Sequence, residues 1–201
     1  TEFRVGECKA DLAILNGTAT VYEIKSERDS LSRLERQISA YRKVFAKVYV
    51  IAGENHVEAI LNLVPQDVGI LKLSNRQYIS SLREALDQPE RTCSASIFDS
   101  IRLSEAKQIL ALNGLSVARV PNTELYSVLR EAFIKLPSHV AHAGMVQILK
   151  KTRSLRTLGE LVEQLPNSLQ SAALTVPLRK IDHERLLQAV HARLSDVLKW
   201  R

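Results

Sequence analysis

Residues 19–45 read ATVYEIKSERDSLSRLERQISAYRKVF, and this stretch decides the fold class. Its first seven residues are rich in β-branched and aromatic side chains, which predicts a strand over 19–25. The polar turn from Ser26 to Ser30 supplies good helix N-cap residues. A helix is predicted over 31–45, because apolar residues recur there at three- and four-residue steps, at Leu31, Leu34, Ile38, Tyr41 and Phe45.

Strand patterns flank this stretch on both sides. Residues 2–8 and 10–15 are predicted strands, and Asn16-Gly17 is a strong tight-turn signal before the strand over 19–25. After the helix come a buried strand over 48–52, a short helix over 56–63 and a strand over 68–73. The order β-β-β-α-β predicts a mixed sheet, in which the first strands pair antiparallel and the helix over 31–45 is a crossover.

After about residue 95 the strand patterns disappear. Helices are predicted over 103–113, 122–135, 138–151, 155–165, 167–175 and 182–199, each bounded by cap or breaker residues. The predicted fold class is therefore α/β, with a mixed-sheet core over 1–90 and an all-α domain over 95–201. The segment from Glu90 to Ser96 is the expected linker.

Composition narrows the class of protein. The chain has 201 residues, 45% of them hydrophobic and 25% charged, which is typical of a soluble globular protein. No apolar run is long enough to span a bilayer, and Cys8 and Cys93 match no zinc or redox spacing, so a cytoplasmic protein is expected. The net charge of +6 suits a polyanionic partner, although a solvated basic surface explains it equally well.

Three charged residues interrupt the apolar strands. Asp11 lies between apolar neighbours, and Glu23 and Lys25 alternate with Tyr22 and Ile24 in the next strand, so both face the same side of the sheet. Buried charges are costly unless they are paired or bind a metal. Two carboxylates can hold Mg²⁺ or Mn²⁺, and a neighbouring lysine can orient an attacking water. The alternative is a cross-strand salt-bridge cluster on a solvated face.

The hairpin between these strands supplies a test of a shared metal. A strict two-residue Asn16-Gly17 loop would pair Asp11 with Tyr22 and place Asp11 and Glu23 on opposite faces. A shared metal therefore requires a loop of odd length or a bulge. We predict a three-residue loop, Leu15-Asn16-Gly17, with Gly17 in the left-handed conformation.

Asp11 followed by Glu23-x-Lys25 resembles the signature of the PD-(D/E)XK, or restriction-endonuclease-like, superfamily. The following helix adds Gln37-x-x-x-Tyr41, which is similar to the Q-x-x-x-Y motif of its RecB-like branch. The whole stretch from Glu2 to Ile51, about a quarter of the chain, looks like small bacterial and phage proteins of this superfamily. These motifs together are moderately specific, whereas Glu-x-Lys alone is weak.

The resemblance implies a metal-dependent deoxyribonuclease. Asp11, Glu23 and the Ile24 carbonyl would bind Mg²⁺ or Mn²⁺, Lys25 would assist the water, and Gln37 and Tyr41 would support the site. Family members also have a helix before the first strand whose Glu completes the site. The sequence begins too late to show such a helix, and Glu2 or Glu7 could take its place.

Basic residues supply expected contacts to nucleic acid. Arg33, Arg36 and Lys43 lie on the helix over 31–45, and Lys150, Lys151 and Arg153 form a basic run in the helical region. For each of them, ordinary surface or helix-end charge is the alternative. DNA is the expected partner, with RNA left open.

Two other classes of function remain open. The core can be a degenerate nuclease fold that serves as a DNA-binding or protein-interaction module. Alternatively, the protein can be an assembly or regulatory factor in which the helical half does the work, through a protein partner or a second copy of the chain. Convergence of Asp11, Glu23 and Lys25 on one pocket favours the enzyme.

Overall fold

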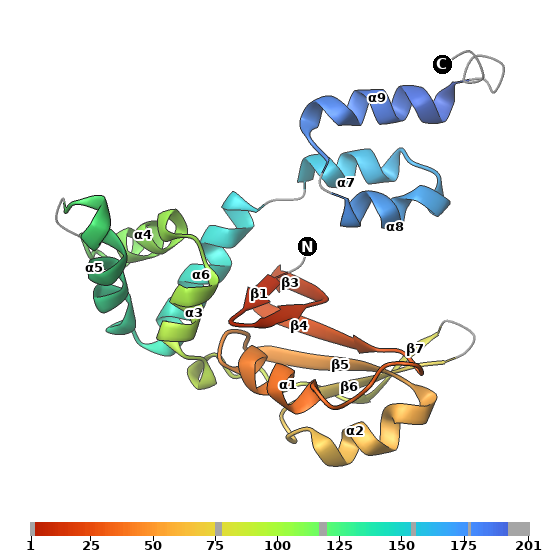
Figure 1. Ribbon diagram of the computed structural model, residues 1–201, viewed down its shortest axis with the longest axis horizontal. Coiled ribbons are helices and arrows are strands. Elements are labelled where there is room, and N and C mark those ends of the chain that lie inside the picture. Colours follow the sequence, from red (N-terminus) through yellow and green to blue (C-terminus); the bar gives the residue numbers. More distant parts are fainter. Residues whose placement is uncertain (1–2, 75–77, 117–119, 154–155, 177, 193–201) are drawn as a thin grey trace. The chain divides into compact units, whose positions relative to one another are not determined.

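A computed structural model describes residues 3–74, 78–116, 120–153, 156–176 and 178–192 of the chain (Figure 1). The chain forms two compact units, one over residues 2–152 and one from residue 153 onward. Each unit is described by itself.

A five-stranded mixed sheet forms the centre of the first unit. The strands lie in the order β3-β4-β5-β6-β7, namely Leu12–Asn16, Thr18–Lys25, Lys47–Gly53, Gly69–Leu73 and Ile79–Arg83. Strands β3 and β4 pair antiparallel, β4, β5 and β6 are parallel, and β7 returns antiparallel to β6. Helix α1, Leu34–Arg42, connects β4 to β5, so the predicted crossover and mixed sheet are confirmed.

The N-terminal segment is a separate small hairpin rather than the single predicted strand over 2–8. Strands β1, Phe3–Val5, and β2, Cys8–Ala10, pair antiparallel around a turn at Gly6 and Glu7. Gly6 has a φ of 56°, a conformation that glycine adopts without steric cost. The chain therefore reverses direction once more before β3, and this hairpin lies beside the sheet.

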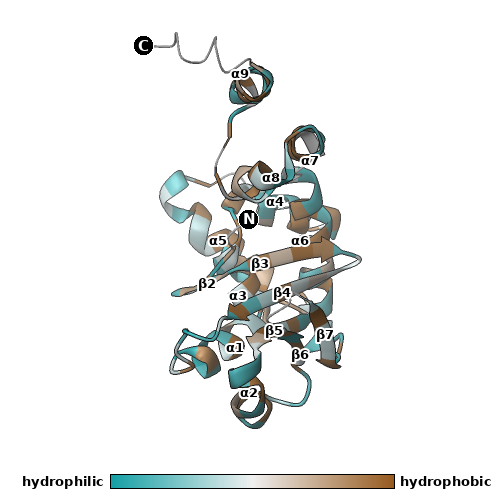
Figure 2. Ribbon diagram, turned by 90° about the vertical axis from the view of Figure 1, so that its right-hand side faces the viewer, coloured by the Kyte–Doolittle hydropathy of each residue, from teal (hydrophilic) through white to brown (hydrophobic). Residues whose placement is uncertain are grey.

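Helices α1 and α2 pack against the sheet through one side each. Helix α2, Val57–Leu63, follows the 3₁₀ turn η1, Glu54–His56. Leu34, Ile38 and Ile60 are buried in the same hydrophobic cluster as Val21 and Val50. Figure 2 shows both hydrophilic and hydrophobic residues along α1 and α2, as expected of helices with one buried side.

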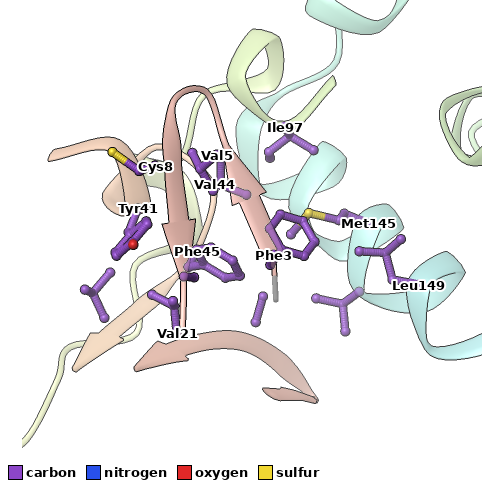
Figure 3. Close-up of a cluster of buried hydrophobic side chains, with 14 of the residues drawn as sticks. Phe3, Val5, Cys8, Val21, Tyr41, Val44, Phe45, Ile97, Met145 and Leu149 are labelled. Atoms are coloured by element: carbon purple, nitrogen blue, oxygen red, sulfur yellow. The ribbon is translucent and has the colours of Figure 1, made fainter. Parts of the chain in front are cut away.

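Four further helices complete the first unit. They are α3, Ser94–Ser100, α4, Leu103–Leu112, α5, Asn122–Ile134, and α6, Ser138–Thr152. Phe3 lies between Phe45 and the α6 residues Met145 and Leu149 (Figure 3), and its ring packs edge-on against Phe45 with centroids 5.2 Å apart. The expected domain boundary at 90–95 is therefore wrong, because α3–α6 share one hydrophobic core with the sheet.

A cluster of charged side chains connects the segment that follows β7 to α1. Asp67 accepts hydrogen bonds from both Arg42 (2.9 and 3.1 Å) and Arg91, and Arg91 also donates to the main-chain oxygens of Phe45 and Ala46. Arg91 belongs to the 3₁₀ turn η2, Pro89–Arg91. The predicted linker over 90–96 is thus a packed connection, in which only Thr92 and Cys93 separate η2 from α3.

The second unit contains helices α7, Arg156–Glu163, α8, Asn167–Thr175, and α9, Lys180–His191. Leu161, Leu165 and Ala173 form the centre of its own small hydrophobic cluster. These helices confirm the helical character predicted for the C-terminal region, while residues 193–199 of the last predicted helix lie outside the described residues. None of the helices in the described part of the chain has the length and apolar content that a membrane crossing requires.

His142 of α6 makes the stability of the first unit pH-dependent. Its side chain is buried, and burial lowers the pKa of the imidazole from its ordinary value of 6.5, against the opposing charges of Asp87 and Glu90. The folded state therefore favours the neutral ring. The neutral His142 ring contributes fully to the free energy of unfolding above pH 6.5, and this contribution is lost as the pH falls through the lowered folded-state pKa. Between these two pKa values the free energy of unfolding falls by at most about 1.4 kcal/mol per pH unit.

Denaturant unfolding between pH 7.5 and 5.5 measures this effect. We expect the wild-type protein to lose more stability over this range than His142→Gln. His139→Gln is the matched control, because His139 is exposed one turn earlier on the same helix. Equal pH slopes in wild-type protein and His142→Gln would show that the wild-type slope has another origin.

Candidate active site

The hairpin between β3 and β4 has the odd register that a shared site requires. Asn16 pairs with Thr18 and Leu15 with Ala19, which leaves Gly17 alone at the turn with a φ of 73°. The predicted left-handed Gly17 and odd loop length are confirmed. The predicted three-residue loop is wrong, because Leu15 and Asn16 both belong to the ladder and Gly17 alone forms the loop. The ladder begins where Leu12 pairs with Tyr22, and Asp11 lies in the bend directly before it.

Glu23 is the centre of a buried hydrogen-bond network between β4 and α1. Its Oε1 accepts from Lys25 Nζ at 2.8 Å and from Gln37 Nε2 at 2.5 Å, and its Oε2 lies 2.9 Å from the Tyr41 hydroxyl. Lys25 Nζ also donates to Gln37 Oε1 at 3.0 Å. Glu23 and Lys25 are 2% and 6% exposed, which excludes the alternative of a solvated surface cluster.

Helix α1 supplies two of these contacts for a simple geometric reason. Gln37 and Tyr41 are four residues apart and therefore share one face of the helix, which packs on the sheet above Glu23. Burial, followed by the charge of Glu23 and the hydrogen bond to it, raises the pKa of Tyr41. The phenol therefore keeps its proton and can donate it to Glu23 Oε2 or to the main-chain oxygen of Lys9, which is also at 2.9 Å.

Asp11 lies at the edge of this network rather than within a strand. It occupies a bend between β2 and β3, and its Oδ2 accepts from the main-chain N–H of Ile24 at 2.8 Å. The expectation that Asp11 sits inside a strand is wrong, because β2 ends at Ala10, β3 begins at Leu12, and the chain bends at Asp11 between them. The bend nevertheless fixes the exposed Asp11 carboxylate beside β4.

These residues border one hollow of about 300 Å³. Asp11, Glu23, Ile24, Lys25 and Gln37 all line it, whereas Tyr41 lies behind Glu23. Glu7 also lines it, and Glu2 lies outside the described residues. The structure therefore brings together the predicted metal-binding and catalytic residues, with Tyr41 as a supporting residue.

Asp29 also lines the hollow, and it is not among the residues predicted from the sequence. Its Oδ2 accepts from the main-chain N–H and the hydroxyl of Ser26, at 2.7 and 2.5 Å. The hydrogen bond from the Ser26 hydroxyl is the main reason that the pKa of Asp29 is lowered. The Ser-x-x-Asp spacing directly after the strand is a signal for such a closed turn.

The predicted nucleic-acid contacts separate into two groups. Arg33 and Arg36 line the hollow, and Lys43 lies farther along α1. Lys150 and Lys151 are exposed in the last turn of α6, where their positive charges interact favourably with the negative end of the helix dipole. Arg153 falls in the second unit, so the basic run over 150–153 is divided between the two units.

The donor set fits a hard divalent cation. Asp11 and Glu23 supply carboxylate oxygens, and Ile24, whose carbonyl was predicted as a further ligand, lines the same hollow. A carboxylate has about four lone-pair positions, so the three protein donors around Glu23 leave one on Oε2. Within the described ranges, no three His, Cys, Asp or Glu side chains group closely enough to hold an ion. An ion here would therefore need water or substrate oxygens in addition.

One comparison with known proteins covers the whole of the first unit. The family model described as bacteriophage P4 protein cII matches residues 1–157. Protein cII of Enterobacteria phage P4 is 36% identical over 86 residues, which cover 43% of this chain and 32% of that protein. The matched stretch thus spans about a third of the length of the curated relative.

A solved structure of a protein of unknown function from Silicibacter pomeroyi aligns with 57% of this chain and 79% of its own, at 18% identity and a TM-score of 0.34. That score is too low for any conclusion about the present fold. The family match, in contrast, covers residues 1–157, more than three quarters of the chain, and includes every element from the β1–β2 hairpin to α6. The chain belongs to the bacteriophage P4 protein cII family.

Proposed function

We propose that this protein is a divalent-metal-dependent nuclease that hydrolyses phosphodiester bonds in DNA, with a PD-(D/E)XK-like site in the hollow beside β4. One observation carries the proposal. The Asp11 carboxylate accepts the main-chain N–H of Ile24, next to Glu23, so that two carboxylates and the Lys25 ammonium group border one hollow. A cross-strand ion pair alone would require neither Asp11 nor the supporting contacts from α1.

Each residue has a distinct proposed role. Asp11 and Glu23, with the Ile24 carbonyl, would hold Mg²⁺ or Mn²⁺, and the bound ion would activate a water and polarise the scissile phosphate. Lys25 would orient that water and stabilise the negative charge that develops on the phosphate. Gln37 and Tyr41 are positioning residues, because their hydrogen bonds fix the rotamer of Glu23.

A second function is favoured by the completeness of the Glu23 network. Three protein donors already satisfy both carboxylate oxygens, so the network is stable as a purely structural element. The site would then be a degenerate nuclease fold that binds nucleic acid, or another protein, without cleaving DNA. Nucleic-acid binding without any metal-dependent cleavage would favour this module over the enzyme.

A cleavage assay tests the enzyme proposal. Purified protein is incubated with labelled single-stranded, duplex and branched DNA, and with RNA, in Mg²⁺, in Mn²⁺ or in EDTA. We expect cleavage of at least one DNA substrate with either metal and none in EDTA. Cleavage that is undiminished in EDTA, or intact substrates under every metal condition, would refute the proposed function.

A further inference from the structure

The active-site hollow continues into a second hollow along α1. The second hollow, also about 300 Å³, is lined by Lys43, which directly follows α1, and by Ser96 and Asp99 of α3. The Asp99 carboxylate pairs with Arg130. Glu7, Cys8 and Arg36 line both hollows, so the two share a border at the β1–β2 turn. We call the two hollows together the α1 groove.

A row of cations follows one side of this groove. Arg36 lies within α1, and Arg33 and Lys43 are the residues directly before and after it. Their spacings of three and seven residues place them along the same side of α1 as Ala40, which lines the second hollow. With a rise of about 1.5 Å per residue, the row is ~15 Å long. All three cationic side chains are exposed, and among the described residues neither Arg33 nor Lys43 forms an ion pair.

The middle cation faces a competing carboxylate where the two hollows meet. Arg36 Nη1 lies 3.9 Å from Glu7 Oε2, and the two side chains are 66% and 88% exposed. Such an exposed, long ion pair contributes little to stability and yields readily to another anion. Glu7 belongs to the turn of the β1–β2 hairpin, so the pair connects that turn to α1 across the groove.

We infer that the α1 groove binds the sugar–phosphate backbone of one nucleic-acid strand, which extends from the active-site hollow past Arg36 to Lys43. In the free protein Glu7 pairs with Arg36, and a phosphate group of the bound strand takes the place of the Glu7 carboxylate. The inference rests on the proposed function and adds to it the path of the substrate. The groove lies between a helix and a hairpin turn, and its cations form a single row, which fits one strand rather than both strands of a duplex.

Two neutralising substitutions at the same ion pair should have opposite effects. Arg36→Gln removes a phosphate contact, so we expect the Kd for a labelled oligothymidylate to rise about tenfold. The salt dependence of log K should become shallower by about 0.7. Glu7→Gln frees Arg36 and removes a negative charge, so the Kd should fall about two- to threefold. Fluorescence anisotropy in EDTA measures both without hydrolysis.

The exposed pair Lys72 and Glu54, 3.3 Å apart, supplies matched controls, because neither residue lines the groove. Lys72→Gln and Glu54→Gln carry the same charge changes and should leave the Kd within twofold of wild type. The inference is overturned if Arg36→Gln and Glu7→Gln shift the Kd in the same direction, or if the control pair reproduces their effects. It is also overturned if a duplex of the same length binds as tightly as the single strand.

The binding and cleavage assays together distinguish the proposed nuclease activity from the proposed strand path along α1. Opposite shifts in EDTA together with no cleavage in Mg²⁺ or Mn²⁺ would refute the nuclease and retain the groove as a binding site. Metal-dependent cleavage with no effect of Arg36→Gln or Glu7→Gln on binding would retain the nuclease and refute the path along α1.

Discussion

Lys25→Ala should reduce the rate of metal-dependent DNA cleavage at least about 100-fold, which corresponds to about 2.7 kcal/mol of transition-state stabilisation. The reason is the position of the ammonium group, 2.8 Å from Glu23 Oε1 at the border of the active-site hollow. With alanine, Glu23 keeps its contacts to Gln37 and Tyr41, but no cation remains there to orient the water. Single-turnover cleavage with substrate-saturated enzyme measures this effect.

Lys107→Ala is the control for this experiment, because Lys107 is an exposed lysine on α4 that lines neither hollow of the α1 groove. Its cleavage rate should equal that of the wild-type protein. Near-ultraviolet circular dichroism of Lys25→Ala checks that the loss is chemical rather than structural. Equal cleavage by wild-type protein and a folded Lys25→Ala would end the nuclease proposal at this site.

Asp67→Ala should lower the free energy of unfolding by about 3 kcal/mol or more. Asp67 is the anion shared by Arg42 and Arg91, and the Asp67 and Arg91 side chains are only 10% and 16% exposed. Removal of the carboxylate leaves the Arg91 guanidinium buried without its counter-charge. Arg42 is more exposed, so water compensates for more of its loss.

Asp99→Ala provides the comparison for Asp67. Asp99 also pairs with an arginine, Arg130, at 3.2 Å, but both side chains are about 40% exposed. Because solvent screens an exposed pair, this substitution should cost less than about 1 kcal/mol. Denaturant unfolding of the two variants measures the difference, and equal losses would show that the Asp67 cluster is not a special anchor of the fold.

Local patterns in the sequence were enough to predict which side chains lie around Glu23. Alternation in β4 placed Glu23 and Lys25 on one face, and the four-residue spacing of Gln37 and Tyr41 placed both on the side of α1 that contacts them. The requirement for an odd hairpin also followed from parity alone. These features depend on fixed geometric periods, so the sequence determines them without knowledge of the tertiary structure.

Features that depend on distant partners were not predictable in the same way. Strand β7 has the sequence ISSLR, and it forms through pairing with β6 rather than through strong strand propensity. Helix α3 is rich in serine, and burial of Ile97 and Phe98 in the shared core stabilises it. The position of the unit boundary after α6 likewise follows from the contacts of Phe3 with Met145 and Leu149, which lie far away in the sequence.

The most direct test of the proposed site is single-turnover cleavage of a labelled DNA strand as Mn²⁺ is titrated, in wild-type protein and in Asp11→Asn. Asparagine keeps an oxygen that can accept the Ile24 N–H bond but loses the charge that would bind the ion. We expect saturable, Mn²⁺-dependent cleavage in wild-type protein and a loss of at least about 100-fold in Asp11→Asn. Cleavage with the same Mn²⁺ dependence in both proteins would contradict the assignment of Asp11, Glu23 and Lys25 to one metal-dependent active site.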